Sequence, residues 1–427
     1  MKVKIIGYGV SGKAAESFLE SRGIETVVVA DAAEKIDGEF DFCVVSPGVP
    51  AEAVADETVP VIPEVELPFY LDPSIKPKCL VAVTGTNGKT TIVNQINKMC
   101  LDDGKNAVLC GNVGTPVSRV ADKLPRAIAV VEVSSFMLEQ TKVLHPHIAV
   151  LTNITSDHLD RHHTMQEYVR CKQQIVANQT GKDYLIVNWD DKNAREVGLA
   201  VQKTGKSKVI WYSTSCKVKG YHLCHGSIYE SKLWGRKRLC AVSDLGGMPH
   251  TLANSLAVIA VGRLLGVSLT AIIQACKYRE QAHRIELVAD NNGVAFYNDS
   301  KATNIAACLA ATRAFTLPIC LILCGQTKGQ DYQELLLNLP THVTSVIVFG
   351  ACQSEVLSKA TALGVKKVYP VADLKAALTK AVELCVRPGV VLFSPAGSSF
   401  DQFKNYEHRG EKFRELVGEL IRQTPQY

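Results

Sequence analysis

The sequence predicts an α/β protein of three domains with largely parallel sheets. Strand-like apolar runs alternate with helix-like segments along most of the 427 residues, and this alternation is typical of parallel strands joined by helices. At about 150 residues per domain, the length predicts about three domains. Hydrophobic residues make up 47% and charged residues 21% of the chain, which excludes disordered, collagen-like and coiled-coil proteins.

The predicted N-terminal domain covers residues 1–78. We expect strands at residues 3–7 and 26–30 and a helix at 11–22. The turn between the first strand and the helix reads G-x-G-x-x-G, and Asp31 stands at the end of the second strand. This combination is typical of a Rossmann-like domain that binds a dinucleotide, although many tight strand–helix turns share it. A nicotinamide-dependent dehydrogenase therefore stays open as an alternative.

Two boundaries separate the three predicted domains. Five prolines lie between Pro60 and Pro77, and because proline neither continues a helix nor donates to a sheet, we expect a linker there. The central domain is predicted to cover residues 79–280. The C-terminal domain, residues 281–427, is predicted to begin with two strands around an Asn-Gly turn.

The most specific pattern in the chain is TGTNGKTT at residues 84–91, between a strand-like run and a helix-like segment. Glycines let backbone N–H groups close around phosphate oxygens, and the helix N-terminus adds partial positive charge. Lys89 can reach the β- and γ-phosphates, and the Thr90 hydroxyl can bind Mg²⁺. The usual spacing needs a glycine at Val83, so this is a compact variant. The predicted ATP-binding residues of the loop are Gly85, Thr86, Asn87, Gly88, Lys89, Thr90 and Thr91.

A Mg·ATP site usually has a carboxylate at the end of a neighbouring strand. Glu132 closes the strand-like run AIAVVE and fits this position, the alternative being a solvated glutamate. The central domain is therefore predicted to be a P-loop ATPase domain. A non-catalytic nucleotide-binding module stays open as a further alternative.

Longer motifs make the chain resemble the Mur ligase family of ATP-dependent amide-forming enzymes. The first are TGTNGKTT, EVSSF at 132–136 and TNITSDHLDRH at 152–162. NDSKATN at 298–304 and SPAGSSFDQFKNYEHRG at 394–410 are similar to the members that add D-glutamate. The alternative within this class is another Mur ligase or a ligase like folylpolyglutamate synthetase.

The resemblance implies a fold, a reaction and its substrates. It implies a Rossmann-like domain at each end of the chain and a role in peptidoglycan synthesis. The substrates would be the small molecules UDP-N-acetylmuramoyl-L-alanine and D-glutamate, joined through an acyl phosphate. The implied cofactors are ATP and two Mg²⁺ ions.

The resemblance also implies roles for particular residues. Thr90 and Glu132 would bind one Mg²⁺, and His158 and Lys172 the second. Lys172 would be carbamylated, which turns an ammonium into an anionic oxygen ligand; without the resemblance, a solvated lysine is the simpler interpretation. The implied catalytic residues are Lys89, His158, Lys172 and Lys301. Further implied contacts are Asn254, Arg284 and Asp299 with ATP; Val10, Ser11, Asp31, Gly48 and Asn112 with the UDP end of the substrate; and Thr303, Lys328, Ser399 and Tyr406 with D-glutamate.

Some positions depart from the pattern of the family. Ala32 and Ala33 stand where relatives often carry polar or basic groups. Cys324 stands where a second glycine is common, and Tyr406 where phenylalanine is usual. A competing interpretation concerns His158 and His162, whose spacing of four would place both on one helical face and suits zinc. No third ligand has a convincing spacing, so zinc is the weaker alternative.

The amino-acid composition indicates the cellular compartment of the protein and the chemical class of its partners. Fourteen cysteines without a CxxC pair indicate reduced, buried thiols in a cytoplasmic protein. Residues 1–78 hold 7 Lys and Arg and 14 Asp and Glu, which gives this segment a net charge of −7. Because the whole chain has a net charge of +5, the remaining residues have a net charge of +12. A basic remainder suits anionic small molecules. We expect a monomer without nucleic-acid or membrane partners, since basic runs are short and no apolar stretch approaches about 18 residues.

Overall fold

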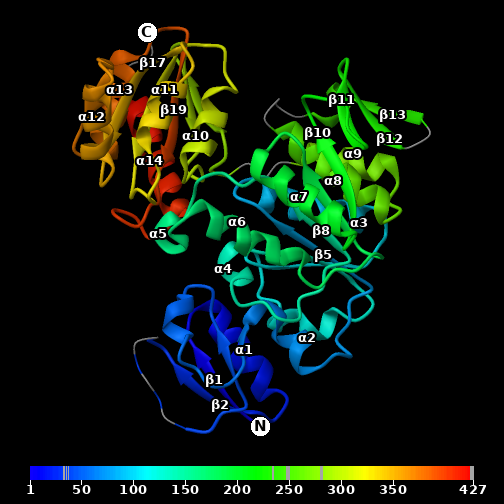
Figure 1. Cartoon of the computed structure of the whole chain (residues 1–427). Helices are drawn as coiled ribbons and strands as arrows, with labels where there is room; N and C mark the ends of the chain where they lie inside the picture. The colour runs from blue at the N-terminus through cyan, green and yellow to red at the C-terminus, as the bar shows by residue number, and fades with distance from the viewer. Residues whose placement is uncertain are drawn as a thin grey trace. The chain divides into compact units, whose positions relative to one another are not determined.

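The computed structural model describes residues 1–31, 34, 36, 38–232, 235–246, 251–278 and 282–423. These residues form three β-sheets flanked by helices (Figure 1). The chain divides into two compact units. The first comprises residues 1–154, 163–247 and 251–278, and the second comprises 155–162, 248–250 and 279–427.

The first sheet of the first unit is parallel, with strand order β2-β1-β3-β4. Helix α1 begins directly after the glycine turn, and an added Cβ at Gly12 would stand 2.1 Å from the carbonyl oxygen of Gly7. Glycine is therefore required there for close packing of helix and strand. The elements are β1 Lys2–Ile6, α1 Val10–Glu20, β2 Glu25–Val29, β3 Phe42–Val45, the 3₁₀ helix η1 Ala51–Val54 and β4 Val61–Pro63.

The linker predicted between Pro60 and Pro77 is wrong as a description of this segment. It contains β4, the 3₁₀ helix η2 Glu64–Glu66 and the helix α2 Leu67–Leu71. Ile62, Val65 and Leu67 are fully buried in a core that also includes residues of the second sheet. Prolines limited this segment to short elements but did not keep it out of the core.

Two buried glutamates fasten this segment to the rest of the first unit. Glu64 accepts a hydrogen bond from the backbone N–H of Ser118 at 2.7 Å. The Glu66 carboxylate accepts three backbone N–H groups, from residues 142, 143 and 144, at 2.6, 2.9 and 2.8 Å. Burial raises the pKa of both carboxyl groups, and these backbone hydrogen bonds act in the opposite direction.

The second sheet has nine strands in the order β13-β12-β11-β10-β9-β8-β5-β7-β6. From β6 to β11 every neighbouring pair is parallel, and β12 and β13 add an antiparallel edge. The strands are β5 Cys79–Thr84, β6 Ala107–Gly111, β7 Ile128–Glu132, β8 Ile148–Leu151, β9 Tyr184–Asn188, β10 Lys208–Ser213, β11 Gly220–Cys224, β12 Ser227–Lys232 and β13 Gly235–Ala241.

Helices connect and cover this sheet. Val81, Val83 and other strand residues pack with α3, α8 and α9 in one core cluster. Strand residues whose side chains lie on the other face of this sheet, such as Leu80 and Ala82, belong to a core that also contains residues of the first sheet. The helices are α3 Lys89–Asp102, η3 Ser118–Lys123, α4 Ser135–Leu138, α6 Met165–Gln173, η4 Gln174–Val176, α7 Lys192–Thr204, η5 Val242–Leu245, α8 Leu252–Leu264 and α9 Leu269–Lys277.

The second unit contains a six-stranded sheet of order β14-β15-β19-β16-β17-β18. Only the β14–β15 pair is antiparallel among its described pairs, and Asn292 and Gly293 turn between them with positive φ, as the sequence predicts. The elements are α5 Leu159–His162, β14 Glu286–Asn291, β15 Val294–Asn298, α10 Ile305–Thr312, β16 Ile319–Cys324, α11 Tyr332–Asn338, β17 Val343–Phe349, α12 Gln353–Ala362, β18 Val368–Pro370, α13 Leu374–Leu384, β19 Gly389–Ala396 and α14 Tyr406–Gln423.

Both faces of this third sheet are covered. Helices α13 and α14 pack in one core cluster, and α10, α11 and α12 contribute to another. The α/β class with mainly parallel sheets is thereby confirmed. The predicted domain boundary near residue 280 lies among residues 279–281, outside those that the structure describes.

Candidate active site

The predicted phosphate loop joins β5 to α3, and donors from the first unit hold its carbonyl oxygens. The half-buried Lys89 donates its ammonium to the carbonyls of Gly85 and Thr86 at 2.8 and 2.9 Å. The Thr152 hydroxyl donates to the carbonyl of Asn87 at 2.7 Å. Because the first N–H groups of a helix have no intrahelical acceptor, the 14-residue α3 offers donors to an anion at its start. Thr90 and Thr91 lie in this first turn.

Two glycines of the loop lie too close to other side chains for any larger residue. Gly85 has φ +145°, and an added Cβ would stand 1.8 Å from the hydroxyl oxygen of Thr152. Gly88 has φ +90°, and its Cβ would stand 2.5 Å from Oδ1 of Asn254. The structure therefore brings Asn254 of α8 against the phosphate loop; its contact with ATP stays a prediction.

Glu132 ends β7, which pairs with β5, and its side chain is buried at 2% exposure. Its Oε1 accepts a hydrogen bond from the Asn112 amide at 2.8 Å. Its Oε2 is buried and has no hydrogen-bond partner among the described residues. A buried carboxylate oxygen without a partner is costly unless a cation or donor reaches it. This observation fits the Mg²⁺ ligand that the sequence predicts.

Lys172 lies on α6 and is only 1% exposed. Its ammonium donates to the carbonyl of Gly85 at 2.9 Å and stands 4.6 Å from the centre of the Tyr168 ring. The Tyr168 hydroxyl in turn lies 3.2 Å from Oγ1 of Thr86. The interpretation of Lys172 as a solvated lysine is wrong, because tertiary packing places it at the phosphate loop.

Four of the five residues predicted to contact the UDP end lie at one edge of the first sheet. Val10 and Ser11 begin α1, Asp31 follows β2, and Gly48 follows β3. Since β1, β2 and β3 are parallel, these positions share the edge at the carboxyl ends of the strands. Asn112 instead follows β6 of the second sheet and binds Glu132. Ala32 and Ala33 lie outside the described residues.

The predicted ATP contacts Arg284 and Asp299 lie in the second unit. Asp299 directly follows β15 and is buried. Its carboxylate accepts hydrogen bonds from the Ser394 hydroxyl at 2.7 Å and from the backbone N–H of Ile285 at 3.2 Å. Burial raises the pKa of Asp299 to about 7, although Ser394 and the charge of Arg284 act to lower it. The Nε of Arg284 is buried without a hydrogen-bond partner among the described residues.

Two of the residues predicted for D-glutamate are in contact within the second unit, and the segment of a third pairs with a segment close to them. The Lys328 ammonium lies 3.5 Å from Oγ1 of Thr303 and 3.2 Å from Oδ1 of Asp157. Ser399 is buried and follows Ser398, whose backbone pairs with Gln326, two residues before Lys328. The structure thus gathers Thr303, Lys328 and the Ser399 segment beyond the carboxyl ends of β15, β16 and β19.

Asp157 was not predicted as a site residue from the sequence, although it is adjacent to His158, a predicted Mg²⁺ ligand. Burial acts to raise its pKa, but Lys328, His158 and the amide of Asn304 outweigh burial and hold the pKa below its usual value. His158 has φ +53° and precedes α5, so His158 and His162 do not share a helical face and the zinc spacing argument fails. The ring of His158 lies 3.7 Å from the Asp157 carboxylate.

The remaining predicted residues of the second unit lie around the start of α14. The ammonium of Lys301 stands 5.4 Å from the centre of the Tyr406 ring. Tyr406 begins α14, and its carbonyl accepts the Ser300 hydroxyl at 2.8 Å. Cys324 is buried at the end of β16, where burial raises its pKa to about 12.

Arg409 lies in the motif at 394–410 but was not predicted as a site residue from the sequence. Arg409 is fully buried, and its guanidinium donates to the hydroxyl and the carbonyl of Ser300 at 3.0 and 2.8 Å. It also donates to the carbonyl of Gly397 at 3.0 Å. Arg409 therefore ties the segment of Lys301 and Thr303 to the segment of Ser399. A buried arginine with backbone partners leaves no spacing signal in the sequence.

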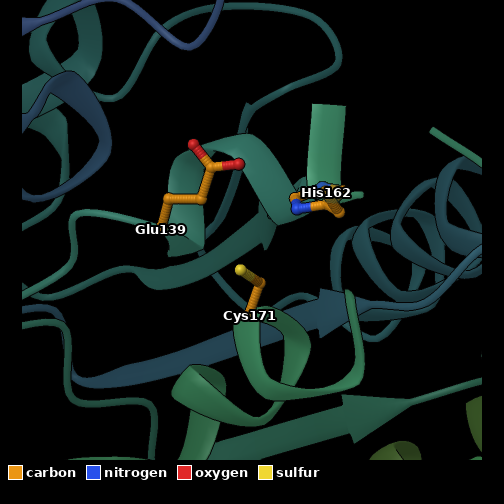
Figure 2. A group of neighbouring side chains, drawn as sticks. All are labelled: Glu139, His162 and Cys171. Atoms are coloured by element: carbon orange, nitrogen blue, oxygen red, sulfur yellow. The ribbon is translucent and has the colours of Figure 1, made fainter. Parts of the chain in front are cut away.

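Figure 2 draws Glu139, His162 and Cys171, the group of metal-ligand types that the described residues contain. Glu139 follows α4 and Cys171 lies on α6, both in the first unit, whereas His162 belongs to the second unit. Burial raises the pKa of the Cys171 thiol to about 12, so the thiolate that binds metals is disfavoured. This group does not add a metal site to the two that the sequence predicts.

Comparison with known proteins decides the family. The Mur ligase middle domain matches residues 83–262, and the Mur ligase glutamate ligase domain matches residues 283–397. A relative from Pelotomaculum thermopropionicum is 35% identical over 97% of this chain and 97% of its own length. The chain belongs to the Mur ligase family. That relative carries the name UDP-N-acetylmuramoylalanine--D-glutamate ligase.

Other relatives of this Mur ligase carry the same name. The protein from Koribacter versatilis is 34% identical and covers 99% of this chain and 98% of its own length. Solved structures share the fold at lower identity. UDP-N-acetylmuramate-alanine ligase MurC from Thermotoga maritima has a TM-score of 0.59 at 18% identity, covering 98% of this chain and 100% of its own. MurF ligase from Thermotoga maritima, in complex with ADP, has a TM-score of 0.61 at 17% identity, covering 92% and 98%.

The helices among the described residues of this Mur ligase are short or polar relative to a membrane span. None of these described helices combines the length and the apolar character that crossing a bilayer requires.

We predict that Arg409→Lys lowers the free energy of unfolding by about 1–3 kcal/mol, because a lysine cannot keep all three hydrogen bonds and leaves a buried carbonyl without a donor. Urea denaturation checks this change. Arg422→Lys, an exposed position on the same helix, is the matched control. Equal denaturation midpoints for the two variants would contradict the tying role of Arg409.

Proposed function

We propose that this chain is an ATP-dependent amide ligase that adds D-glutamate to UDP-N-acetylmuramoyl-L-alanine in peptidoglycan synthesis. The proposal rests on relatives of that name that match nearly the full length of the chain. The observation that carries the chemistry is the phosphate loop, whose carbonyls are held by Lys89, Lys172 and Thr152 beside the buried carboxylate of Glu132.

ATP and Mg²⁺ fit the residues at the phosphate loop. The glycine cradle at Gly85 and Gly88 leaves room only for backbone, as a loop that closes on phosphates requires. The unpartnered Oε2 of Glu132 and the hydroxyl of Thr90 would hold one Mg²⁺, a cation that prefers oxygen ligands. When bound, Mg²⁺ supplies neutralisation of phosphate charge. Asn254 would contact the nucleotide from α8, and Arg284 and Asp299 are proposed nucleotide contacts from the second unit.

We propose Lys172 as the carbamylated residue. Its amine is buried and lies against the backbone of the phosphate loop, where a new anionic oxygen would serve as a Mg²⁺ ligand. The predicted second Mg²⁺, with His158 as the further ligand, rests on the sequence motif.

The two substrates are assigned to different sheets. The carboxyl edge of the first sheet, with Val10, Ser11, Asp31 and Gly48, is the proposed site of the UDP end. Asn112 keeps its predicted substrate contact as a proposal and has the added task of orienting Glu132. In the second unit, Lys328 supplies a cation for one carboxylate of D-glutamate, with Thr303, Ser399 and Tyr406 beside it.

The proposed reaction makes a poor electrophile reactive. The γ-phosphoryl group of ATP is transferred to the carboxylate of the L-alanyl group, which gives an acyl phosphate with a good leaving group. The amine of D-glutamate then attacks the acyl carbon, and phosphate departs. Lys89 and Lys301 are the proposed cations that stabilise the transferring phosphoryl group, because phosphoryl transfer needs mainly positioning and charge neutralisation. We propose that the reaction takes place in the cytoplasm, because its substrates are a UDP-linked molecule and ATP. The monomeric state stays a prediction.

We predict that phosphate release requires ATP, Mg²⁺, UDP-N-acetylmuramoyl-L-alanine and D-glutamate together. Release on replacing D-glutamate by L-alanine or L-lysine would indicate another ligase of the family. A dehydrogenase or a non-catalytic nucleotide-binding module would release no phosphate with any of these mixtures.

In the same assay, Lys328→Ala should raise the KM for D-glutamate by about ten- to a hundredfold, because a charged hydrogen bond contributes about 1.5–3 kcal/mol. The KM for ATP should change much less. Lys375→Ala, at an exposed position of α13, is the control and should leave both values unchanged. An equal rise in both KM values would assign Lys328 to ATP instead.

Carbamylation of Lys172 predicts a carbon-13 carbamate signal when the protein is equilibrated with ¹³C-labelled bicarbonate. The signal should disappear in Lys172→Ala and persist in Lys203→Ala, a control lysine exposed on α7. A signal of equal intensity in Lys172→Ala would refute the assignment, whatever the activity of the variants.

A further inference from the structure

A cavity of the first unit lies at the amino ends of its central strands, away from the phosphate loop. Its volume is about 660 Å³. Ile128, Ile148, Leu264 and Leu265 provide apolar surface at the starts of β7 and β8 and at the end of α8. Lys78, Lys105, Arg126 and Lys182 line the same cavity. Apolar side chains and cations thus line one cavity, which opens to solvent where Lys78, Arg126 and Lys182 are exposed.

The positive charge of this cavity is largely uncompensated. Across residues 1–31, 34, 36, 38–232, 235–246, 251–278 and 282–423, no ion pair involves Lys78, Arg126 or Lys182, whereas Lys105 pairs with Asp103 at 3.0 Å. The lining contains one acid, Asp183, which is buried. Its Oδ2 already receives hydrogen bonds from His145 and Thr180. Lys78, Arg126 and Lys182 outnumber this one carboxylate, so net positive charge remains for an external anion.

His147 adds a neutral donor to the lining. Its Nδ1 accepts the backbone N–H of Leu80 at 3.0 Å, so the proton of the neutral ring lies on Nε2. Burial lowers the pKa of this ring below its usual value, which keeps it neutral near pH 7. The cavity thus offers charged donors and one N–H donor of fixed tautomer.

The backbone of Arg126 is held in an unfavourable conformation at this cavity. Its φ is +71°, a left-handed value that glycine adopts more easily than arginine. The turn is fixed on one side by the bridge between Pro77 and Pro125 and on the other by the hydrogen bond from Lys78 to Ala127 at 2.8 Å. Strain of this kind is more frequent at ligand sites than elsewhere.

We propose that this cavity binds a small phosphate monoester with an apolar or planar body. The phosphate group would lie among Lys78, Arg126 and Lys182, since a dianion matches several cations gathered at the mouth of one cavity. The apolar body would lie against Ile128, Ile148, Leu264 and Leu265. The cavity supplies both halves of this recognition, as small-molecule sites usually do.

This site is separate from the phosphate loop of the same unit. Strand β5 runs from Cys79 at the cavity to Thr84 before the loop. These two residues are about 17 Å apart at the usual rise of a strand. A ligand in the cavity should therefore not compete with a nucleotide at the phosphate loop. The proposal does not depend on the proposed ligase activity.

Methyl-resolved NMR of the full chain, labelled at Ile and Leu and saturated with Mg·ADP, tests the proposal. Titration with phenyl phosphate should shift the methyl signals of Ile128, Ile148, Leu264 and Leu265. Phenyl phosphate should bind about tenfold more tightly than inorganic phosphate and than benzyl alcohol, because each of these lacks one half of the contact. Equal affinities for phenyl phosphate and inorganic phosphate would contradict the proposed apolar contact. Equal affinities for phenyl phosphate and benzyl alcohol would contradict the proposed contact with the cations.

Variants locate the phosphate group. Arg126→Gly removes the guanidinium and leaves a residue that favours the observed backbone, so the fold should persist. Combined with Lys182→Ala, it should weaken phenyl phosphate binding at least tenfold, while Lys203→Ala on α7 should have no effect. Unchanged affinity in the folded double variant would overturn the proposal. Displacement of phenyl phosphate on adding ADP to nucleotide-free protein would overturn it as well.

Discussion

The close approach of backbone to side chain at Gly85 and Gly88 is the constraint on which the rest of the candidate site depends. At Gly85 the backbone lies where a Cβ would overlap the Thr152 hydroxyl, and at Gly88 where it would overlap the Asn254 amide. Thr152 follows β8 and Asn254 lies on α8, so the loop is fixed from two separate elements. With the loop in place, the start of α3 and the end of β7 bring their donors and the Glu132 carboxylate to the same edge of the sheet.

The charged groups around this loop and in the second unit are held by partners from distant segments. Glu132 is oriented by Asn112, Lys172 by the carbonyl of Gly85, and Arg409 by Ser300 and Gly397. Burial of a charge is costly unless hydrogen bonds compensate it, so each of these groups is confined to one position. Confinement gives a ligase the preorganised cations and carboxylates that phosphoryl transfer needs. It also leaves buried polar atoms without a hydrogen-bond partner within the described part of the chain, such as Oε2 of Glu132, which lowers stability.

Sequence patterns predicted the features whose signal is local. Glycines, Lys89 and Thr90 stand in one short segment, and the Asn-Gly turn at 292–293 was predicted for the same reason. The buried segment after Pro60 was missed because proline counts report on backbone hydrogen bonding, not on packing. Lys172 looks solvated on its own helix, and only the fold brings it to Gly85. Arg409 and Asp157 were missed because their partners, backbone carbonyls and Lys328, lie far away in the sequence.

The most direct test of the central claim is the affinity of Gly85→Ala for Mg·ADP, measured by isothermal titration calorimetry. Gly181→Ala is the matched control, because its φ is not in the left-handed region and the nearest atom to its added Cβ is 3.9 Å away. Circular dichroism should show that both variants are folded. The account predicts at least tenfold weaker binding by Gly85→Ala, a difference of about 1.4 kcal/mol or more, and unchanged binding by Gly181→Ala. Unchanged affinity of folded Gly85→Ala would contradict the claim that the nucleotide binds at this loop.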